Sequence, residues 1–124
     1  MLWHKNRVLY LVAFYAAIAV SSATSAPAGS FLSDRSATTK AIAILKGDPY
    51  GNSESQVKAN IQQRRLVTDG MTKVCGPVKN PIWEFHVVVD TGKKEQFKNG
   101  VIDGYLVLDA RTGKIKCTNL PLLD

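Results

Sequence analysis

The stretch that decides the fold runs from Ile102 to Cys117 and reads IDGYLVLDARTGKIKC. Apolar residues recur at alternate positions of its first half, as in a strand with one buried face. The DARTG segment then predicts a tight turn, because Asp109 can bond the turn backbone and Gly113 can adopt a positive φ. The residues KIKC return as a second strand. The stretch therefore predicts a β-hairpin that ends on a cysteine.

That cysteine is one of only two in the chain, the other being Cys75. In an oxidising compartment an isolated pair of cysteines usually forms a disulfide. The chain-entropy model gives roughly 4 kcal/mol for closing a loop of this length. A redox-active pair would typically be spaced C-x-x-C, and zinc would need more ligands than the chain offers. We expect a structural disulfide between Cys75 and Cys117, and no metal site.

The N-terminus carries the signals of export. Residues 1–7 are basic and contain no acid, and the unbroken apolar run VLYLVAFYAAIAV follows over 8–20. A membrane-spanning helix needs about 20 residues, so this shorter run favours a cleaved signal peptide over an uncleaved anchor. Ala26-Pro27-Ala28 fits the A-x-A pattern and predicts cleavage after Ala28. The mature protein is then secreted or periplasmic, without stable membrane insertion.

The mature part, residues 29–124, has the length of one small domain with a modest core. The whole chain carries a net charge of +6, and removal of Lys5 and Arg7 with the signal peptide lowers this to +4. The simplest explanation of this mild excess is a solvated surface that keeps a small protein soluble. In an exported protein it fits an acidic partner better than nucleic acid, which we do not expect as a partner.

Two helices are predicted before the sheet. The spacing of apolar residues indicates a first helix over 35–46 and a second over 54–67. The capping-box motif SESQ would start the second helix, and Gly70 would end it. The exposed face of this helix would carry four polar residues, namely Lys58, Gln62, Gln63 and Arg64. A face of this kind is usually solvated, and Arg64 is our candidate on it for contact with a partner.

Beyond the second helix, alternation replaces helical spacing. It predicts a short strand over 71–78, a strand over 82–90, and the hairpin strands 101–110 and 114–117. The core face of strand 82–90 would be formed by Trp83, Phe85, Val87 and Val89. Helices followed by an antiparallel meander give an α+β domain, with two N-terminal helices packed on a sheet of three or four strands. The apolar tail NLPLLD is expected to cover a sheet edge.

Three segments resemble the PepSY-like domains of exported bacterial proteins: ATTKAIAILKG, WEFHVVVD and IDGYLVLDARTGKI. The shared pattern is an Ala-rich helix, an aromatic residue before a run of valines, and a strand that ends in D-A-x-T-G-K, here Asp109–Lys114. It spans about half of the mature chain, without a counterpart for the second helix or the cysteine pair. The resemblance implies a small α+β module without catalytic residues that binds or restrains peptidases and other envelope proteins.

Residues with catalytic chemistry are few. His86 is the only histidine of the mature part, and Glu84 lies two positions away, so the two could perform acid–base work. The alternative is a half-exposed histidine on the second face of a sheet. Asp103 and Asp109 would lie roughly 20 Å apart on one strand, beyond the separation that a glycosidase uses. No nucleophile elbow or phosphate-binding loop is present, so we expect no catalytic residues and no cofactor.

Aromatic residues in loops often anchor protein interfaces. Tyr50 and Phe97 are therefore candidate partner contacts together with Arg64. Our leading hypothesis is a non-catalytic exported module that binds an envelope or secreted protein and inhibits or modulates an envelope enzyme such as a peptidase. The alternatives are an immunity protein that neutralises an exported toxin, a small hydrolase that uses His86 with Glu84, and a structural envelope component.

Overall fold

The computed structural model describes residues 30–69 and 71–123. The predicted signal peptide over 1–28, Gly29 and the helix end expected at Gly70 lie outside the described residues. No helix in the described part is long and apolar enough to cross a membrane. In chain order the elements are α2 (Asp34–Leu45), α3 (Glu54–Asn60), β1 (Ile61–Val67), β2 (Ile82–Asp90), the short 3₁₀ helix η1 (Lys98–Gly100), β3 (Val101–Asp109) and β4 (Ile115–Thr118).

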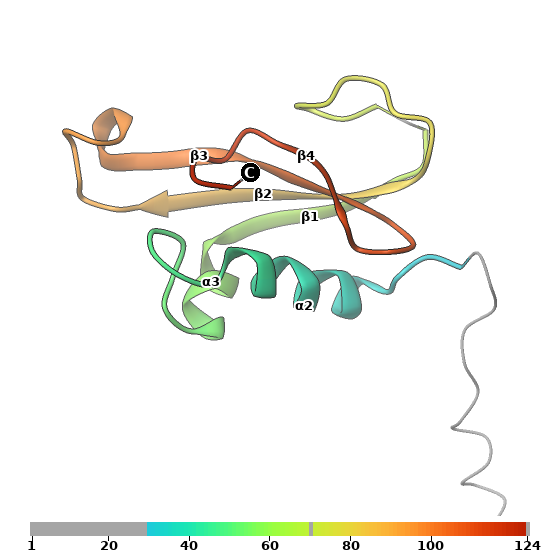
Figure 1. Ribbon diagram of the computed structural model, residues 1–124, viewed down its shortest axis with the longest axis horizontal. Coiled ribbons are helices and arrows are strands. Elements are labelled where there is room, and N and C mark those ends of the chain that lie inside the picture. Colours follow the sequence, from blue (N-terminus) through green and yellow to red (C-terminus); the bar gives the residue numbers. More distant parts are fainter. Residues whose placement is uncertain (1–29, 70, 124) are drawn as a thin grey trace, which may run out of the picture. The chain divides into compact units, whose positions relative to one another are not determined.

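The four strands form one antiparallel sheet in the order β1-β2-β3-β4, and both helices lie on the same side of it (Figure 1). The ladder between β2 and β3 is the longest, running from Ile82 opposite Asp109 to Asp90 opposite Val101. The predicted α+β fold is confirmed, with two helices followed by an antiparallel sheet and one disulfide. We call the side away from the helices the outer face of the sheet.

The main core lies between the helices and the sheet, and the predicted core face of β2 is confirmed. Each fully buried valine, leucine or phenylalanine side chain contributes roughly 2 kcal/mol to the stability of the fold through the hydrophobic effect. The indole N–H of Trp83 donates to the Leu32 carbonyl at 3.0 Å, so its polar group is also partnered. The buried members include Ala37, Ala41 and Leu45 of α2, Val57 of α3, Trp83, Phe85, Val87 and Val89 of β2, and Ile102, Leu106 and Leu108 of β3.

The second helix is shorter than predicted, and the expected helix over 54–67 is wrong in its second half. The capping box forms, because the Ser53 hydroxyl accepts from the Gln56 amide while the Gln56 side chain accepts from the Ser53 amide. The helix nevertheless ends at Asn60, and Ile61–Val67 pair with β2 as an edge strand. The pairing with β2 joins residues distant in sequence, and it overrides the local helical spacing.

The predicted strand over 71–78 is also wrong, since this segment contains only an isolated bridge between Met71 and Pro77. The Thr72 hydroxyl accepts from the Cys75 amide at 2.8 Å and donates to the Gly76 carbonyl at 2.7 Å. These two bonds close a tight turn, so the chain bends back where a strand would extend.

The hairpin turn forms as its sequence predicts. The Asp109 carboxylate accepts from the amides of Arg111 and Thr112 at 2.8 and 3.0 Å. Gly113 has a φ of 77°, a conformation that favours glycine, and a Cβ there would lie 2.1 Å from a side-chain carbon of Lys40. The positive φ of the turn is what requires glycine here, whereas the long Lys40 side chain can adopt another rotamer.

The C-terminal segment closes one end of the core and, as predicted, covers part of a sheet edge. The Asn119 side chain accepts from the Tyr105 amide at 2.7 Å, beyond the end of β4. Gly104 permits this approach, because a Cβ there would lie 2.5 Å from the Asn119 side-chain oxygen. The buried Tyr50 hydroxyl donates to the Pro121 carbonyl, which joins the loop between the helices to the tail.

Candidate binding surface

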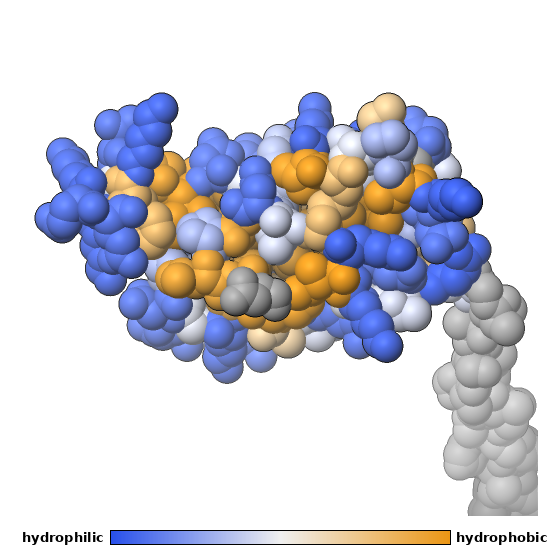
Figure 2. All heavy atoms as spheres, turned by 45° about the horizontal axis from the view of Figure 1, so that its top comes forward, coloured by the Kyte–Doolittle hydropathy of each residue, from blue (hydrophilic) through white to orange (hydrophobic). Residues whose placement is uncertain are grey.

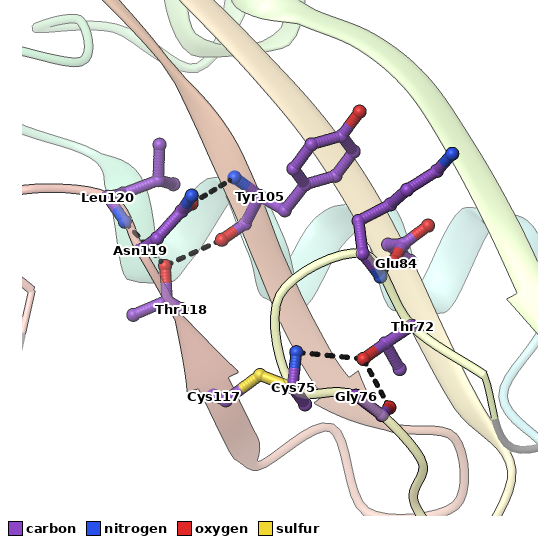
Figure 3. Close-up of a disulfide and its surroundings, with 10 residues drawn as sticks. Thr72, Cys75, Gly76, Glu84, Tyr105, Cys117, Thr118, Asn119 and Leu120 are labelled. Carbon is purple, nitrogen blue, oxygen red and sulfur yellow. Dashed lines mark hydrogen bonds between the residues drawn. A yellow bond between two sulfur atoms is a disulfide. The ribbon is translucent and has the colours of Figure 1, made fainter.

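One end of the outer face is covered by the loop over 68–81, which the disulfide ties to β4 (Figure 3). The Cα atoms of Cys75 and Cys117 lie 6.0 Å apart, within the usual range for a disulfide. A second, smaller apolar cluster forms under the loop, and its buried members are Val67, Ile82 and Val107. The predicted disulfide is thus confirmed, and the stapled loop gives this end of the sheet a core of its own.

Glu84 is buried beside this small cluster, with an exposed fraction of only 3%. One carboxylate oxygen accepts from the Arg65 guanidinium at 2.8 Å, and the other accepts from the Lys73 amide at 2.7 Å. Both oxygens are therefore partnered, as a buried carboxylate requires. This arrangement joins β1 to the loop over 68–81 and gives Glu84 a structural role.

His86 lies on the uncovered part of the outer face. Its Nε2 is 2.7 Å from a carboxylate oxygen of Asp103, and its ring stacks on Tyr105 with centroids 4.7 Å apart. The structure therefore pairs His86 with Asp103, while Glu84 is engaged elsewhere. Among the hydrogen bonds of the described residues, none joins His86 to a hydroxyl or thiol that could act as a nucleophile. Nor do three or more metal-ligating side chains cluster in residues 30–69 or 71–123.

Of the two aromatic candidates, one is buried and the other is partly exposed. Tyr50 is 2% exposed and belongs to the main core. Burial also raises its pKa to about 12, so the hydroxyl keeps its proton and remains a donor to the tail. Phe97 is partly buried and packs against the same core. The expectation of an exposed ring was therefore wrong for Tyr50, while Phe97 keeps part of its surface exposed.

Arg64 remains as an exposed candidate. It lies on the helix side of β1, and its Nε is 2.6 Å from a carboxylate oxygen of Asp34 in α2, with both side chains about half exposed. Arg64 lines a groove of about 650 Å³, and the other lining residues of this groove belong to α2 and α3. The charged groups in the groove have mixed sign, since Arg35, Lys58 and Arg64 face Asp34 and Glu54.

A smaller hollow of about 290 Å³ shares three lining residues with this groove: Thr39, Ile42 and Glu54. It extends the hollowed surface along α2 as far as Lys46. The two hollows therefore adjoin each other at α2.

The groove borders the β1 edge of the sheet. Gln62–Leu66 are five consecutive exposed residues, flanked by the buried Ile61 and Val67. In β3 the amides of Asp109 and Tyr105 bond toward β4 and the tail, so the alternate residues of β3 bond to β2. In β2, the residues between those that bond to β3 bond to β1. Their partners in β1 include Gln63 and Arg65, so the backbone groups of Arg64 and Leu66 point away from the sheet.

A second exposed surface is apolar. Figure 2 shows hydrophobic side chains gathered across the middle of the face that carries β4, with hydrophilic side chains toward its rim. Ile115 in β4 and Leu122 in the tail are among the exposed large apolar side chains, at 41% and 70%. Exposed apolar groups also stand on other elements, so exposure alone does not assign a role to this surface.

Comparison of the chain with family models, curated proteins and solved structures gives no match in any of the three. The likeness to PepSY-like domains thus stays a prediction from the quoted motifs. What the structure adds is the groove and a β1 edge that no strand of the described residues covers. We call Gln62–Leu66 together with the groove residues Asp34, Arg35, Thr39, Glu54 and Lys58 the β1 flank.

Proposed function

We propose that the protein is an exported, non-catalytic module that binds another envelope or secreted protein through the β1 flank. The observation that carries the proposal is the run of five exposed residues, Gln62–Leu66, on an edge strand that adjoins a groove. Edge strands in soluble proteins are usually shortened, covered or interrupted, because open backbone groups invite pairing. A strand edge left open beside a hollow surface is well suited to receive a partner.

The ionisable groups of the fold favour a binding role over a catalytic one. Glu84 and Asp109 are both engaged in bonds that hold loops in place. Asp103 bonds His86, and this pair lies on a sheet face where the described residues supply no bonded nucleophile. The resemblance to PepSY-like domains makes an envelope peptidase the first partner to test, with inhibition or modulation as the effect.

Site-specific photocrosslinking in the exporting cell tests this proposal. The photoreactive residue p-benzoylphenylalanine replaces Gln62 on the edge, Thr39 in the groove, or Lys116 on the opposite edge of the sheet. All three positions are exposed, so the Lys116 variant is a matched control. We expect Gln62 and Thr39 to yield adducts of the same second protein after illumination, and Lys116 to yield none. Adducts from Lys116 alone, or none from the flank, would exclude the proposed surface.

A further inference from the structure

We propose that the partner contributes an extended, acidic segment that adds as a further strand along the outer edge of β1. This inference rests on the proposed function and specifies the chemistry of the partner. It follows from the geometry of the edge backbone and from the charges that the edge presents on its two faces.

The backbone of β1 provides the template. Arg64 and Leu66 direct their amide and carbonyl groups outward, and within residues 30–69 and 71–123 no strand pairs with that side. The strand is seven residues long and contains no proline, so it can accept a ladder over several residues. Its bulge lies at the start, between Ile61 and Gln63, and leaves the outward groups of Arg64 and Leu66 beyond it.

The charges of β1 oppose a second copy of the same strand. Two copies of β1 could pair about a two-fold axis near the middle of the exposed stretch. With the axis at residue 64, Arg64 lies opposite Arg64; with the axis at residue 65, Arg65 lies opposite Arg65. Like charges that lie directly opposite across a ladder destabilise the pair. The same arginines favour a strand that carries acids at these positions.

Both arginines keep capacity for an incoming carboxylate. A guanidinium has five N–H donors. Arg64 uses Nε toward Asp34, and Arg65 uses Nε and Nη2 toward Glu84. Their side chains are still 40% and 53% exposed. Because Arg64 lies on the helix side and Arg65 on the outer face, an added strand meets one arginine on each face, so two adjacent acids complement the edge.

The groove contributes contact area more than charge preference. Side chains of an added strand that point to the helix side would lie over the groove, where Arg35, Lys58 and Arg64 are balanced in part by Asp34 and Glu54. The preference for acids therefore comes from the strand edge itself. An acidic helix could not pair with the outward backbone groups of β1, because its own backbone groups are bonded within the helix. Nor could it place one acid on each face of the sheet.

Synthetic peptides test the pairing directly. The probe is the peptide TVTEETVT, whose central glutamates are adjacent in an extended chain. One control is the peptide TVTKKTVT. Two further controls are TVTEETVT peptides with N-methylated backbone amides, one at the odd-numbered residues and the other at the even-numbered residues. Binding to the processed, disulfide-bonded protein is measured by fluorescence anisotropy at low ionic strength. We expect TVTEETVT to bind at least about tenfold more tightly than TVTKKTVT, since two attractive pairs replace two repulsive ones. One of the two N-methylated peptides should lose binding, because its methyl groups replace the amide hydrogens that donate to β1.

Variants of the protein distinguish the contribution of the β1 backbone to peptide binding from the contribution of its side chains. Leu66→Pro removes the outward amide at a position where an edge strand tolerates proline, and Leu66→Ala is the matched variant that keeps the amide. We expect Leu66→Pro to lose binding of TVTEETVT and Leu66→Ala to retain it. Arg64→Glu provides an independent readout, because it should weaken TVTEETVT and strengthen TVTKKTVT. Circular dichroism identifies any variant that fails to fold.

The outcomes are distinguishable from those of the proposed function. Equal binding of the two charge variants of the peptide, or full binding by a folded Leu66→Pro, would overturn the acidic-strand inference even where crosslinks map to the β1 flank. Concentration-dependent dimerisation that Leu66→Pro abolishes would also overturn it, in favour of a second copy. Absence of crosslinks from the flank would instead remove the proposed function on which the inference rests.

Discussion

The two edges of the sheet are secured in different ways. At the β4 edge the chain is tied by the Cys75–Cys117 disulfide, by the turn around Asp109 and by the bond from the Tyr105 amide to the Asn119 side chain. At the β1 edge, five exposed residues follow one another, and the backbone ladder to β2 and two ion pairs of arginine hold them in place. The disulfide and the turn bonds thus lie at the β4 edge, whereas at the β1 edge no described strand pairs with the outward backbone groups of Arg64 and Leu66, as the proposed recognition requires.

The largest expected effect is at the β4 edge. Replacing both Cys75 and Cys117 with serine should destabilise the protein by roughly 4 kcal/mol, because the unfolded chain regains the freedom of a long loop. Urea unfolding of the oxidised wild type and the double variant measures this difference. The reduced wild type is the control for the substitutions themselves. A loss below about 1 kcal/mol would mean that the loop over 68–81 is held mainly by its non-covalent contacts.

The next largest effect concerns the ion pair between Arg65 of β1 and the buried Glu84 of β2. Arg65→Ala leaves the buried carboxylate of Glu84 with the Lys73 amide as its remaining partner. Stranding a buried charge costs about 3 kcal/mol when its partner is fully buried, and somewhat less here because Arg65 is half exposed. Thermal unfolding of Arg65→Ala, and of the double variant with Glu84→Gln, measures the cost. If removing the charge of Glu84 does not recover part of the stability, the account of a stranded carboxylate is wrong.

The sequence predicted the β4 edge well because its signals are local. The alternation, the DARTG turn and the cysteine lie within one continuous stretch, so residues near in sequence decide the structure. The β1 edge was missed because its residues IQQRRLV are mostly exposed and show no alternation of apolar side chains. Its strand character depends on the ladder to β2, which is a contact between residues distant in sequence.

The candidate site was predicted only in part, for the same reason. Arg64 was chosen as an exposed base on a helix, and it is exposed on a strand instead. Tyr50 and Phe97 were chosen because loops are usually exposed, but a core this small draws its loop aromatics inward to close its end. The bond between Glu84 and Arg65 follows from their positions opposite each other in the ladder. That register could not be derived while Arg65 was assigned to a helix.

A smaller effect should appear on acidification at the β4 edge. Burial opposes ionisation of Asp109, but the amides of Thr112 and Arg111 and the charge of Lys116 together hold its pKa below the usual value. A carboxyl whose pKa is lower in the folded state stabilises the fold above its unfolded pKa. That contribution is lost as the pH falls through the folded pKa. Stability of the wild type should therefore decrease in acid.

Asp109→Asn isolates this contribution, because the amide oxygen can still accept from the turn but carries no charge. Urea midpoints measured from neutral pH down to about pH 2 should fall less steeply for Asp109→Asn than for the wild type. Glu95→Gln is the control, because it removes the charge of an exposed carboxylate in the loop between β2 and β3. Identical slopes for the wild type and Asp109→Asn would show that the turn gains nothing from the charge.

The smallest expected effect on stability is that of Arg64→Ala, and it distinguishes the two arginines of the β1 edge. The partner of Arg64 is the exposed Asp34, whereas the partner of Arg65 is buried. An exposed ion pair contributes less than about 1 kcal/mol, so the unfolding midpoint should barely move. Crosslinking from Gln62 should nevertheless fall, because the edge loses the arginine on its helix side. A folded variant with undiminished crosslinking would mean that Arg64 is only a solvated base, and that recognition at this edge depends on its backbone or on Arg65.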